Sequence, residues 1–318
     1  MAEAKIPVDL SNPGQVFACL GFLEAADVLL GSAEGGFDWT KEADVSFRLR
    51  ANGAENPFGA VLRFLADAKV CRYAPATYKD PPPKEKKKQK KEEPASSQDA
   101  ISPGDIPETS ETFPAPEPDQ MSLPIRLVNN SSRKRVIVVS HWSDGSSRNN
   151  FKLYAGNRSA ANIARAMLMG SREKSKKGQE QGGVKTHGLQ ALWRGDSKAL
   201  EGNPFGIVTP MGGSYNFDPR GAWTGIDAGY SPNDQKHGIA ASPAVEILAA
   251  MGLEHARPYE FETRKVRYGV WGCLLAPLLA RPALGAVPLP FPMRRFVFEL
   301  DLSGKNKVVT FAQEETNP

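Results

Sequence analysis

Histidine and cysteine are scarce in this chain, whose 318 residues include only four of the former and three of the latter. Cys19, Cys71 and Cys273 lie far apart, so no CxxC pair or Cys/His spacing indicates a metal site. We therefore expect neither a metal ion nor a cofactor. Isolated thiols in apolar surroundings are typical of buried cysteines in a reducing compartment, which favours the cytoplasm.

Long apolar stretches and common catalytic fingerprints are missing too. The longest apolar run, 270–280, is interrupted by Gly272 and Pro277 and is far shorter than the roughly 20 residues that span a bilayer. The first residues lack the apolar core of a signal peptide, so we expect no membrane partner. No GxGxxG, GxxxxGKS/T or GxSxG motif occurs, and the glycine pair at 212–213 is typical of a tight turn.

Charge and proline are abundant but unevenly distributed. Residues 75–121 hold ten of the 26 prolines, seven lysines and ten acidic residues. Such a composition buries too little apolar surface to offset its ordering entropy, so we predict a disordered, solvated insertion. The insertion contributes −3 to a net charge of +4, which leaves +7 for the remainder. A moderately basic body is consistent with a phosphate-rich partner.

Apolar periodicity predicts a mixed α+β fold. Residues 1–74 have a β-α-β-α-β pattern, and residues 122–318 form a second α+β part that packs with them as one body. Helices are predicted to begin at Pro13, Pro57, Ala160 and Pro243. Strands are predicted around residues 6–10, 45–49, 70–73, 125–127, 135–139 and 151–154, at 261–270, and in a closing hairpin over 296–311.

Two consecutive segments, a basic loop over 171–187 and glycine-rich loops over 188–241, show neither helical nor strand periodicity. Loops on a rigid scaffold often carry binding residues, and arginines interleaved with aromatic rings suit a polyanion with stacking bases. The residues predicted to bind nucleic acid are Arg158, Arg165, Arg172, Lys174, Lys176, Lys177, Lys185, Trp193, Arg194, Arg220, Trp223, Tyr230 and Lys236. The alternative is a solvated basic surface with the tryptophans in the core.

Two histidines are candidates for acid–base catalysis on RNA, which needs a base near a 2′-hydroxyl and a cation near the phosphorane. His187 follows the basic loop, and His237 lies beside Lys236. An exposed loop position explains His187 more simply, and the aspartates of the glycine-rich loops match no metal-binding spacing. We predict a protein without enzymatic activity, with a metal-independent endoribonuclease as the alternative.

Three stretches of the chain carry a resemblance to a known family. They are the opening Ile6–Asp27, the segment from Asn216-Phe217-Asp218-Pro219-Arg220 to Gly229-Tyr230-Ser231-Pro232-Asn233-Asp234, and Ala280–Leu284 followed by Phe296–Leu300. Together they resemble a small CRISPR-associated protein of the subtype I-U (I-G) Cascade-like effector complex. The resemblance covers most of the chain outside residues 75–121.

This resemblance implies a non-catalytic subunit that binds guide RNA, target DNA or both in antiviral defence. Its implied partners are the guide RNA, the target DNA, the other effector subunits and a helicase-nuclease that the complex recruits. Relatives often use modified ferredoxin-like (RAMP/RRM-type) units, but the glycine-rich loop typical of RAMP proteins is missing here. A backbone-type and a large-subunit-type role both stay open, as does an assembly scaffold without direct nucleic-acid contact.

Overall fold

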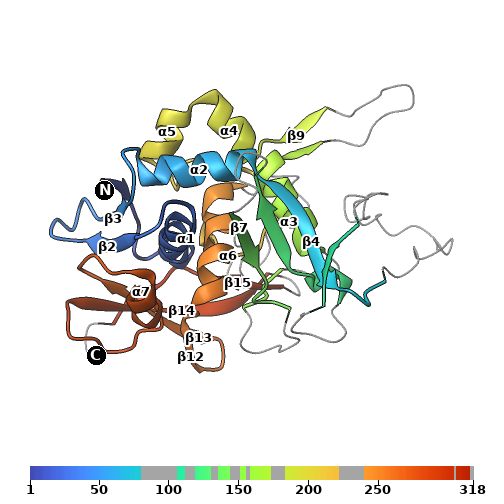
Figure 1. Cartoon of the computed structure of the whole chain (residues 1–318). Coiled ribbons are helices and arrows are strands. Elements are labelled where there is room, and N and C mark those ends of the chain that lie inside the picture. The colour runs from blue at the N-terminus through green and yellow to red at the C-terminus, as the bar shows by residue number, and fades with distance from the viewer. Residues whose placement is uncertain are drawn as a thin grey trace.

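Helices and several small sheets make up the protein, so the predicted α+β class is confirmed (Figure 1). The structure is a computed structural model. It describes residues 1–79, 106–111, 119–129, 135–143, 151–154, 158–172, 183–221, 240–303 and 306–315. The predicted helices at Pro13, Pro57, Ala160 and Pro243 are all confirmed.

The N-terminal part begins with a three-stranded antiparallel sheet in the order β1-β3-β2. Its elements are β1 (Ala2–Pro7), α1 (Pro13–Leu30), β2 (Glu34–Asp38), β3 (Ser46–Ala51) and α2 (Pro57–Asp67). The β-α-β-α-β prediction missed β2, whose Gly35-Gly36 pair hides the usual alternation. A Cβ on Gly36 would lie 2.1 Å from the carbonyl oxygen of Cys273, so glycine is needed for this close contact.

The next strand, β4 (Lys69–Pro75), leaves this sheet and begins another. In a complete ferredoxin-like β-α-β-β-α-β unit it would pair beside β1. Here it pairs with β6 (Ile125–Val128) and, in parallel, with β5 (Glu108–Ser110), and β7 (Val136–Val139) completes the order β5-β4-β6-β7. The ferredoxin-like unit stays a prediction. The strand β5 and the start of the 3₁₀ turn Gln120–Ser122 lie inside the range 75–121 that was predicted to be disordered, most of which lies outside the described residues.

The middle of the chain is richer in regular structure than the sequence pattern indicates. Its elements are α3 (Ala160–Met169), β8 (Ser171–Arg172), β9 (Val184–Thr186), α4 (Leu189–Gly195), α5 (Ser197–Gly202), β10 (Thr209–Pro210), a 3₁₀ turn (Pro219–Gly221) and β11 (Ala240–Ala241). The prediction of loops alone is therefore wrong for residues 189–202. Two short helices form there because Leu189 and Leu200 are buried and the Asp196 side chain caps α5.

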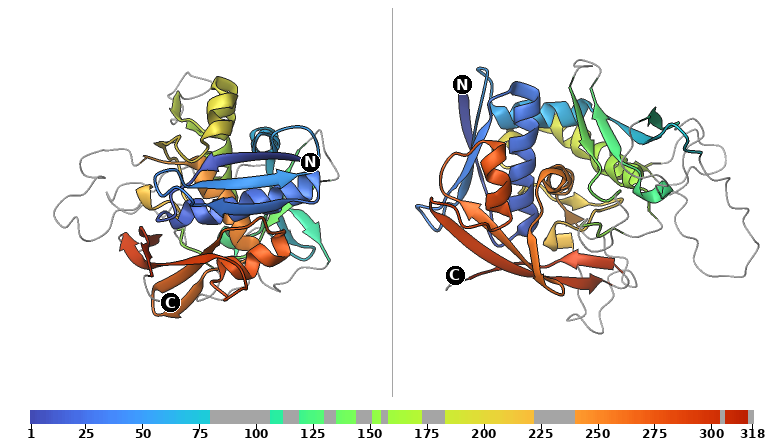
Figure 2. Two further views of the ribbon diagram at one scale, coloured as in Figure 1. Left: turned by 90° about the vertical axis from the view of Figure 1, so that its left-hand side faces the viewer. Right: turned by 60° about the horizontal axis from the view of Figure 1, so that its bottom comes forward.

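The C-terminal part is an antiparallel sheet with two helices. Its elements are α6 (Pro243–His255), β12 (Tyr259–Glu262), β13 (Lys265–Trp271), α7 (Pro277–Leu284), β14 (Met293–Ser303), β15 (Asn306–Val309) and β16 (Gln313–Glu314). The sheet order is β12-β13-β14-β15, with β16 also on β14, so the predicted closing hairpin is confirmed. This sheet lies beside the β1–β3 sheet (Figure 2), and a bridge between Gly35 and Leu275 joins the two regions.

Helices α1 and α6 pack against each other at the centre of the core (Figure 1). A Cβ on Gly21 would lie 1.9 Å from the Leu248 oxygen, and one on Gly252 would lie 2.2 Å from the Phe17 oxygen. The two backbones can approach this closely only because both positions are glycine. Among the described residues, α1 is the one helix long and apolar enough to cross a bilayer, and 83% of it is buried inside the protein.

Candidate nucleic-acid interface

Three of the arginines predicted to bind nucleic acid line one hollow of about 200 Å³. They are Arg158, Arg165 and Arg172, and we call this site the arginine hollow. The remaining lining residues are Asn162, Ile163, Ala166, Gly170, Ser171, Gly212 and Gly213. The hollow lies at α3 and β8. Figure 1 shows α3 and β9 on the side of the molecule away from the β1–β3 sheet.

Helix α3 supplies one wall because its polar residues recur at helical spacing. Asn162 and Arg165 are three residues apart on α3, which places them on one face, and Arg158 lies just before the N-cap residue Ser159. On the opposite face Met167 is fully buried and anchors the helix to the core. Gly170 then turns the chain with φ of 80°, a left-handed conformation that favours glycine, and directs β8 along the hollow.

The guanidinium groups are held in position by neutral acceptors. The Arg158 Nη1 donates to the Gly212 oxygen at 3.1 Å. The Arg165 Nη1 donates to the Asn162 Oδ1 at 3.2 Å, and its Nη2 donates to the Val70 oxygen at 3.1 Å. These bonds orient the side chains, and the acceptors themselves carry no negative charge.

The glycine pair Gly212-Gly213 forms a backbone wall of the hollow. A Cβ on Gly213 would lie 3.2 Å from the Arg158 Nη1, and one on Gly212 would lie 2.7 Å from the Ser171 Oγ. Side chains at these positions would push the 212–213 backbone away from both neighbours. The pair therefore serves the hollow, a role that the interpretation as a simple tight turn did not include.

Among the described residues, the lining of the arginine hollow contains three arginines and no acidic residue. Lys185 is exposed nearby on β9, which pairs with β8. Arginine presents a fixed fork of N–H donors that matches phosphate oxygens in pairs and keeps its charge at any physiological pH. The arrangement can therefore bind an anion, and a phosphate group suits it best.

The other predicted basic and aromatic residues within the described part of the chain do not line this hollow. Arg194 is exposed at the end of α4, and Trp193 packs partly against the core. Arg220 forms an ion pair with the buried Asp218, with 2.6 Å between Nη2 and Oδ2, and its Nη1 donates to the Phe205 oxygen. Its charge is thus balanced inside the protein.

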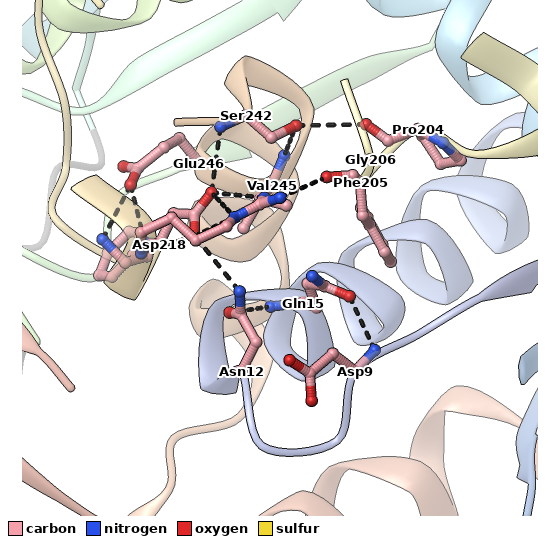
Figure 3. A network of polar contacts seen from close by, with 12 residues as sticks. Asp9, Asn12, Gln15, Pro204, Phe205, Gly206, Asp218, Ser242, Val245 and Glu246 are labelled. Atoms are coloured by element: carbon pink, nitrogen blue, oxygen red, sulfur yellow. Dashed lines mark hydrogen bonds and ion pairs between the residues drawn. The ribbon is translucent and has the colours of Figure 1, made fainter. Parts of the chain in front are cut away.

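Asp218 is the centre of a buried polar network that joins three parts of the chain (Figure 3). Besides Arg220, it accepts hydrogen bonds from the Asn12 side chain, which caps α1, and from the Ser242 backbone N–H at the start of α6. The network fixes the 3₁₀ turn that follows Asp218 against the two central helices. We therefore interpret the Asp218–Arg220 pair as a structural tie.

Glu246, in the first turn of α6, holds the neighbouring backbone. It is fully buried and accepts hydrogen bonds from the backbone N–H groups of Tyr215, Phe217 and Asp218 at 2.7, 3.0 and 2.8 Å. Burial raises the pKa of Glu246 to about 7, although the backbone hydrogen bonds act in the opposite direction. Sequence inspection gave no role to this residue, because it looks like one more polar position on an apolar helix.

Of the two histidine candidates, only His187 lies within the described residues. His187 is exposed, its backbone oxygen accepts from Thr209, and it does not line the arginine hollow. The Nδ1 of buried His141 lies 3.6 Å from Glu254. Burial would raise the pKa of Glu254, but hydrogen bonds from His141 and Ser140 outweigh it and lower the pKa to about 2. No group of metal-ligating side chains occurs within the described ranges.

Seven predicted residues lie outside the described residues: Lys174, Lys176, Lys177, Trp223, Tyr230, Lys236 and His237. Comparison with known proteins adds no relative, because no protein-family model, curated protein or solved structure matches the chain. The resemblance to subtype I-U CRISPR-associated proteins therefore stays a prediction. The strongest support for a function is the chemistry of the arginine hollow.

Proposed function

We propose that this chain binds nucleic acid without cleaving it, and that it contacts the sugar–phosphate backbone through the arginine hollow. The observation that carries the proposal is that Arg158, Arg165 and Arg172 all line one hollow, whose described lining residues include no carboxylate. Arginine side chains that neutralise phosphates release condensed counterions, which gives affinity without sequence reading. The exposed Lys185 on the adjacent strand extends the same basic surface.

The biological setting that fits this activity is a type I (I-U/I-G) CRISPR effector ribonucleoprotein in antiviral defence. In RNA-guided complexes base pairing reads the sequence, and the protein holds the backbone of guide and target. A subunit of this kind needs cationic grooves rather than a catalytic centre. We propose guide RNA or target DNA as the ligand and the other effector subunits as assembly partners.

The test compares two variants with the same change of net charge. One replaces the hollow residues (Arg158→Gln, Arg165→Gln, Arg172→Gln), and the control replaces three arginines outside the hollow (Arg50→Gln, Arg63→Gln, Arg264→Gln). Binding of a labelled single-stranded oligonucleotide is measured by fluorescence anisotropy over a range of salt concentrations. We expect the hollow variant to lose affinity and to flatten the log–log salt dependence by about 2 to 3, at roughly 0.7 to 0.9 per phosphate contact.

The control should keep most of the wild-type slope of the salt dependence. Arg50 and Arg63 form exposed ion pairs, and none of the three control arginines lines the hollow. Equal slopes for the two variants would contradict the assignment of the interface to the hollow. No binding by the wild-type protein at low salt would contradict the nucleic-acid function itself and favour an assembly scaffold. Cleavage of RNA that is lost in His187→Ala or His237→Ala would favour the endoribonuclease.

A further inference from the structure

A second hollow, larger than the arginine hollow, lies where the chain passes from β1 into α1. Its volume of about 690 Å³ falls within the roughly 300–1,000 Å³ of ligand-binding pockets. The other walls are the β2–β3 loop at residues 42–45, the turn after α5 and the first residues of β14. We call this site the N-terminal pocket. In Figure 3, Gln15 lies between Asp9 and Phe205, and all three line the pocket.

Negative charge is in excess around the N-terminal pocket. Its charged lining residues within the described chain are Asp9, Glu42, Asp44, Arg220 and Arg294. Each arginine has an acidic partner that does not line the pocket: Arg220 pairs with Asp218, and the Arg294 Nε donates to the Glu314 Oε1 at 2.6 Å. The hydrogen bond to Glu314 raises the pKa of Arg294, and the nearby charge of Glu42 contributes less. With both partners counted, two positive charges face five negative ones, which leaves an excess of three negative charges.

A buried amide on the same wall has an unused donor. Gln15 is only 7% exposed, and its Oε1 accepts from the Asp9 backbone N–H at 2.9 Å. Within the described part of the chain its Nε2 has no acceptor, although the side chain lines the pocket. Buried amide donors are normally paired, so this group favours a ligand that supplies an oxygen, such as a peptide carbonyl.

The walls that carry these groups are held by backbone hydrogen bonds. The Val8 N–H donates to the Val45 oxygen at 3.0 Å, which joins the end of β1 to the β2–β3 loop. Within that loop, the Asp44 N–H donates to the Lys41 oxygen at 3.0 Å. The pocket is therefore formed before a ligand arrives, which lowers the entropy cost of binding.

A ligand that suits these walls combines positive charges with a main-chain acceptor. Lysine and arginine side chains pair with carboxylates, and their apolar stems pack against apolar surface. A nucleic-acid strand brings charge of the wrong sign to this excess of carboxylates. We infer that the N-terminal pocket binds an extended basic segment of a partner protein, with the carboxylates on its cationic side chains and the Gln15 amide on its backbone. This inference does not rest on the proposed function.

The experiment measures binding of a labelled hexapeptide of alternating arginine and alanine by fluorescence anisotropy. A peptide with glutamine in place of each arginine is the control ligand. We expect wild-type protein to bind the arginine peptide about tenfold more tightly, as a few partly exposed ion pairs give. A pocket variant (Asp9→Asn, Glu42→Gln, Asp44→Asn) should lose this preference, and a matched variant of exposed acids outside the pocket (Asp67→Asn, Glu262→Gln, Glu299→Gln) should keep it.

Salt dependence separates the two kinds of contact. Gln15→Met removes a neutral hydrogen bond, so it should weaken binding by about two- to tenfold at every salt concentration. The pocket variant removes charges, so its remaining binding should depend less on salt than that of the wild type. Equal affinity of wild type for the two peptides, or an equal loss in both triple variants, would overturn the inference.

Self-association provides a further check by analytical ultracentrifugation. A wild-type dimer that the pocket variant abolishes would overturn the inference, because the occupant would then be a second copy of the chain. If the pocket variant fails to fold by circular dichroism, Glu42→Gln with Asp44→Asn, both in the exposed loop, must reduce the arginine preference for the inference to hold. Oligonucleotide binding is measured separately, so the inference and the proposed function can each fail alone.

Discussion

Replacing Glu246 with alanine should destabilise the protein more than any single change at the arginine hollow. The Glu246 carboxylate is fully buried and satisfies three backbone N–H groups, those of Tyr215, Phe217 and Asp218. Leaving a buried donor unsatisfied costs about 1–3 kcal/mol, so three donors cost at least about 3 kcal/mol even at the low end of that range. The cavity left by the side chain adds to this loss.

Glutamine at the same position separates the hydrogen bonds from the packing. Phe217 and Asp218 both donate to Oε1, whereas Tyr215 donates to Oε2. A glutamine oxygen in the Oε1 position keeps two of the three bonds, while its NH₂ group faces the Tyr215 donor. We expect Glu246→Gln to lower the free energy of unfolding by about 1–3 kcal/mol, clearly less than Glu246→Ala.

Urea denaturation followed by circular dichroism measures both changes, provided that the m value stays constant. The exposed Glu262, which pairs with Lys265 at the surface, supplies the control, because Glu262→Ala should change stability by no more than about 0.5 kcal/mol. An alanine variant as stable as the glutamine variant, or within about 1 kcal/mol of wild type, would refute the role of Glu246 as the anchor of this segment.

Two pH effects and one packing effect follow from other contacts. Folding raises the pKa of Glu246 to about 7, so the contribution of this group to stability is fully present below its unfolded pKa and is lost as pH rises through 7. Thermal melts of Glu246→Gln over the same pH range should lack this loss of stability. The pKa of Glu254 is lowered to about 2, so the pH dependence of its contribution to stability is reversed: the contribution is lost as pH falls from about 4.5 towards 2. In acid, the stability of Glu254→Gln should therefore depend less on pH than that of the wild type. Gly21→Ala should cost about 1–3 kcal/mol or more by chemical denaturation, because the new Cβ meets the Leu248 oxygen, whereas Gly195→Ala, with open space around it, should be neutral or stabilising.

Elements with local signals were predictable from the sequence. Asn12 and Pro13 mark the start of α1, and the Asn12 side chain accepts from the Gln15 backbone N–H as an N-cap should. Gly31 ends the helix with φ of 82°. The alternation Phe296, Phe298 and Leu300 likewise identified β14, because one face of this strand is buried and the other is not.

Elements that depend on distant partners were not predictable. The strand β2 exists because Gly35 and Gly36 fit against the segment after β13, more than 230 residues later in the chain. Residues 151–154, predicted as a strand, are instead an irregular buried segment in which Phe151 has a φ of 49°. No alternation pattern encodes such contacts, since they are set by which surfaces meet after folding.

The arginines of the hollow were predictable from the sequence, whereas its glycine wall was not, and this difference has a physical reason. The clustering of basic residues around and after the predicted helix at Ala160 identified Arg158, Arg165 and Arg172. The wall formed by Gly212 and Gly213 was not identified, because the sequence gives no sign that this backbone returns to α3 about 50 residues later. A glycine pair indicates a wall of such a hollow only when the pair and the basic helix are known to lie side by side.

The glycine-rich segment shows why arginine beside aromatic residues is ambiguous in a sequence. Tyr215 and Phe217 are buried, and Arg220 is tied to Asp218, so this part of the segment uses its aromatic and basic residues to complete the core. The same residue types suit a base-stacking surface when they are exposed. Asp218 balances the charge of Arg220, and Glu246, 31 residues after Tyr215 on α6, holds the backbone of this segment. We therefore propose the basic surface for a polyanion at α3, where Arg158 and Arg165 donate to neutral acceptors, rather than at Arg220, which pairs with the buried Asp218.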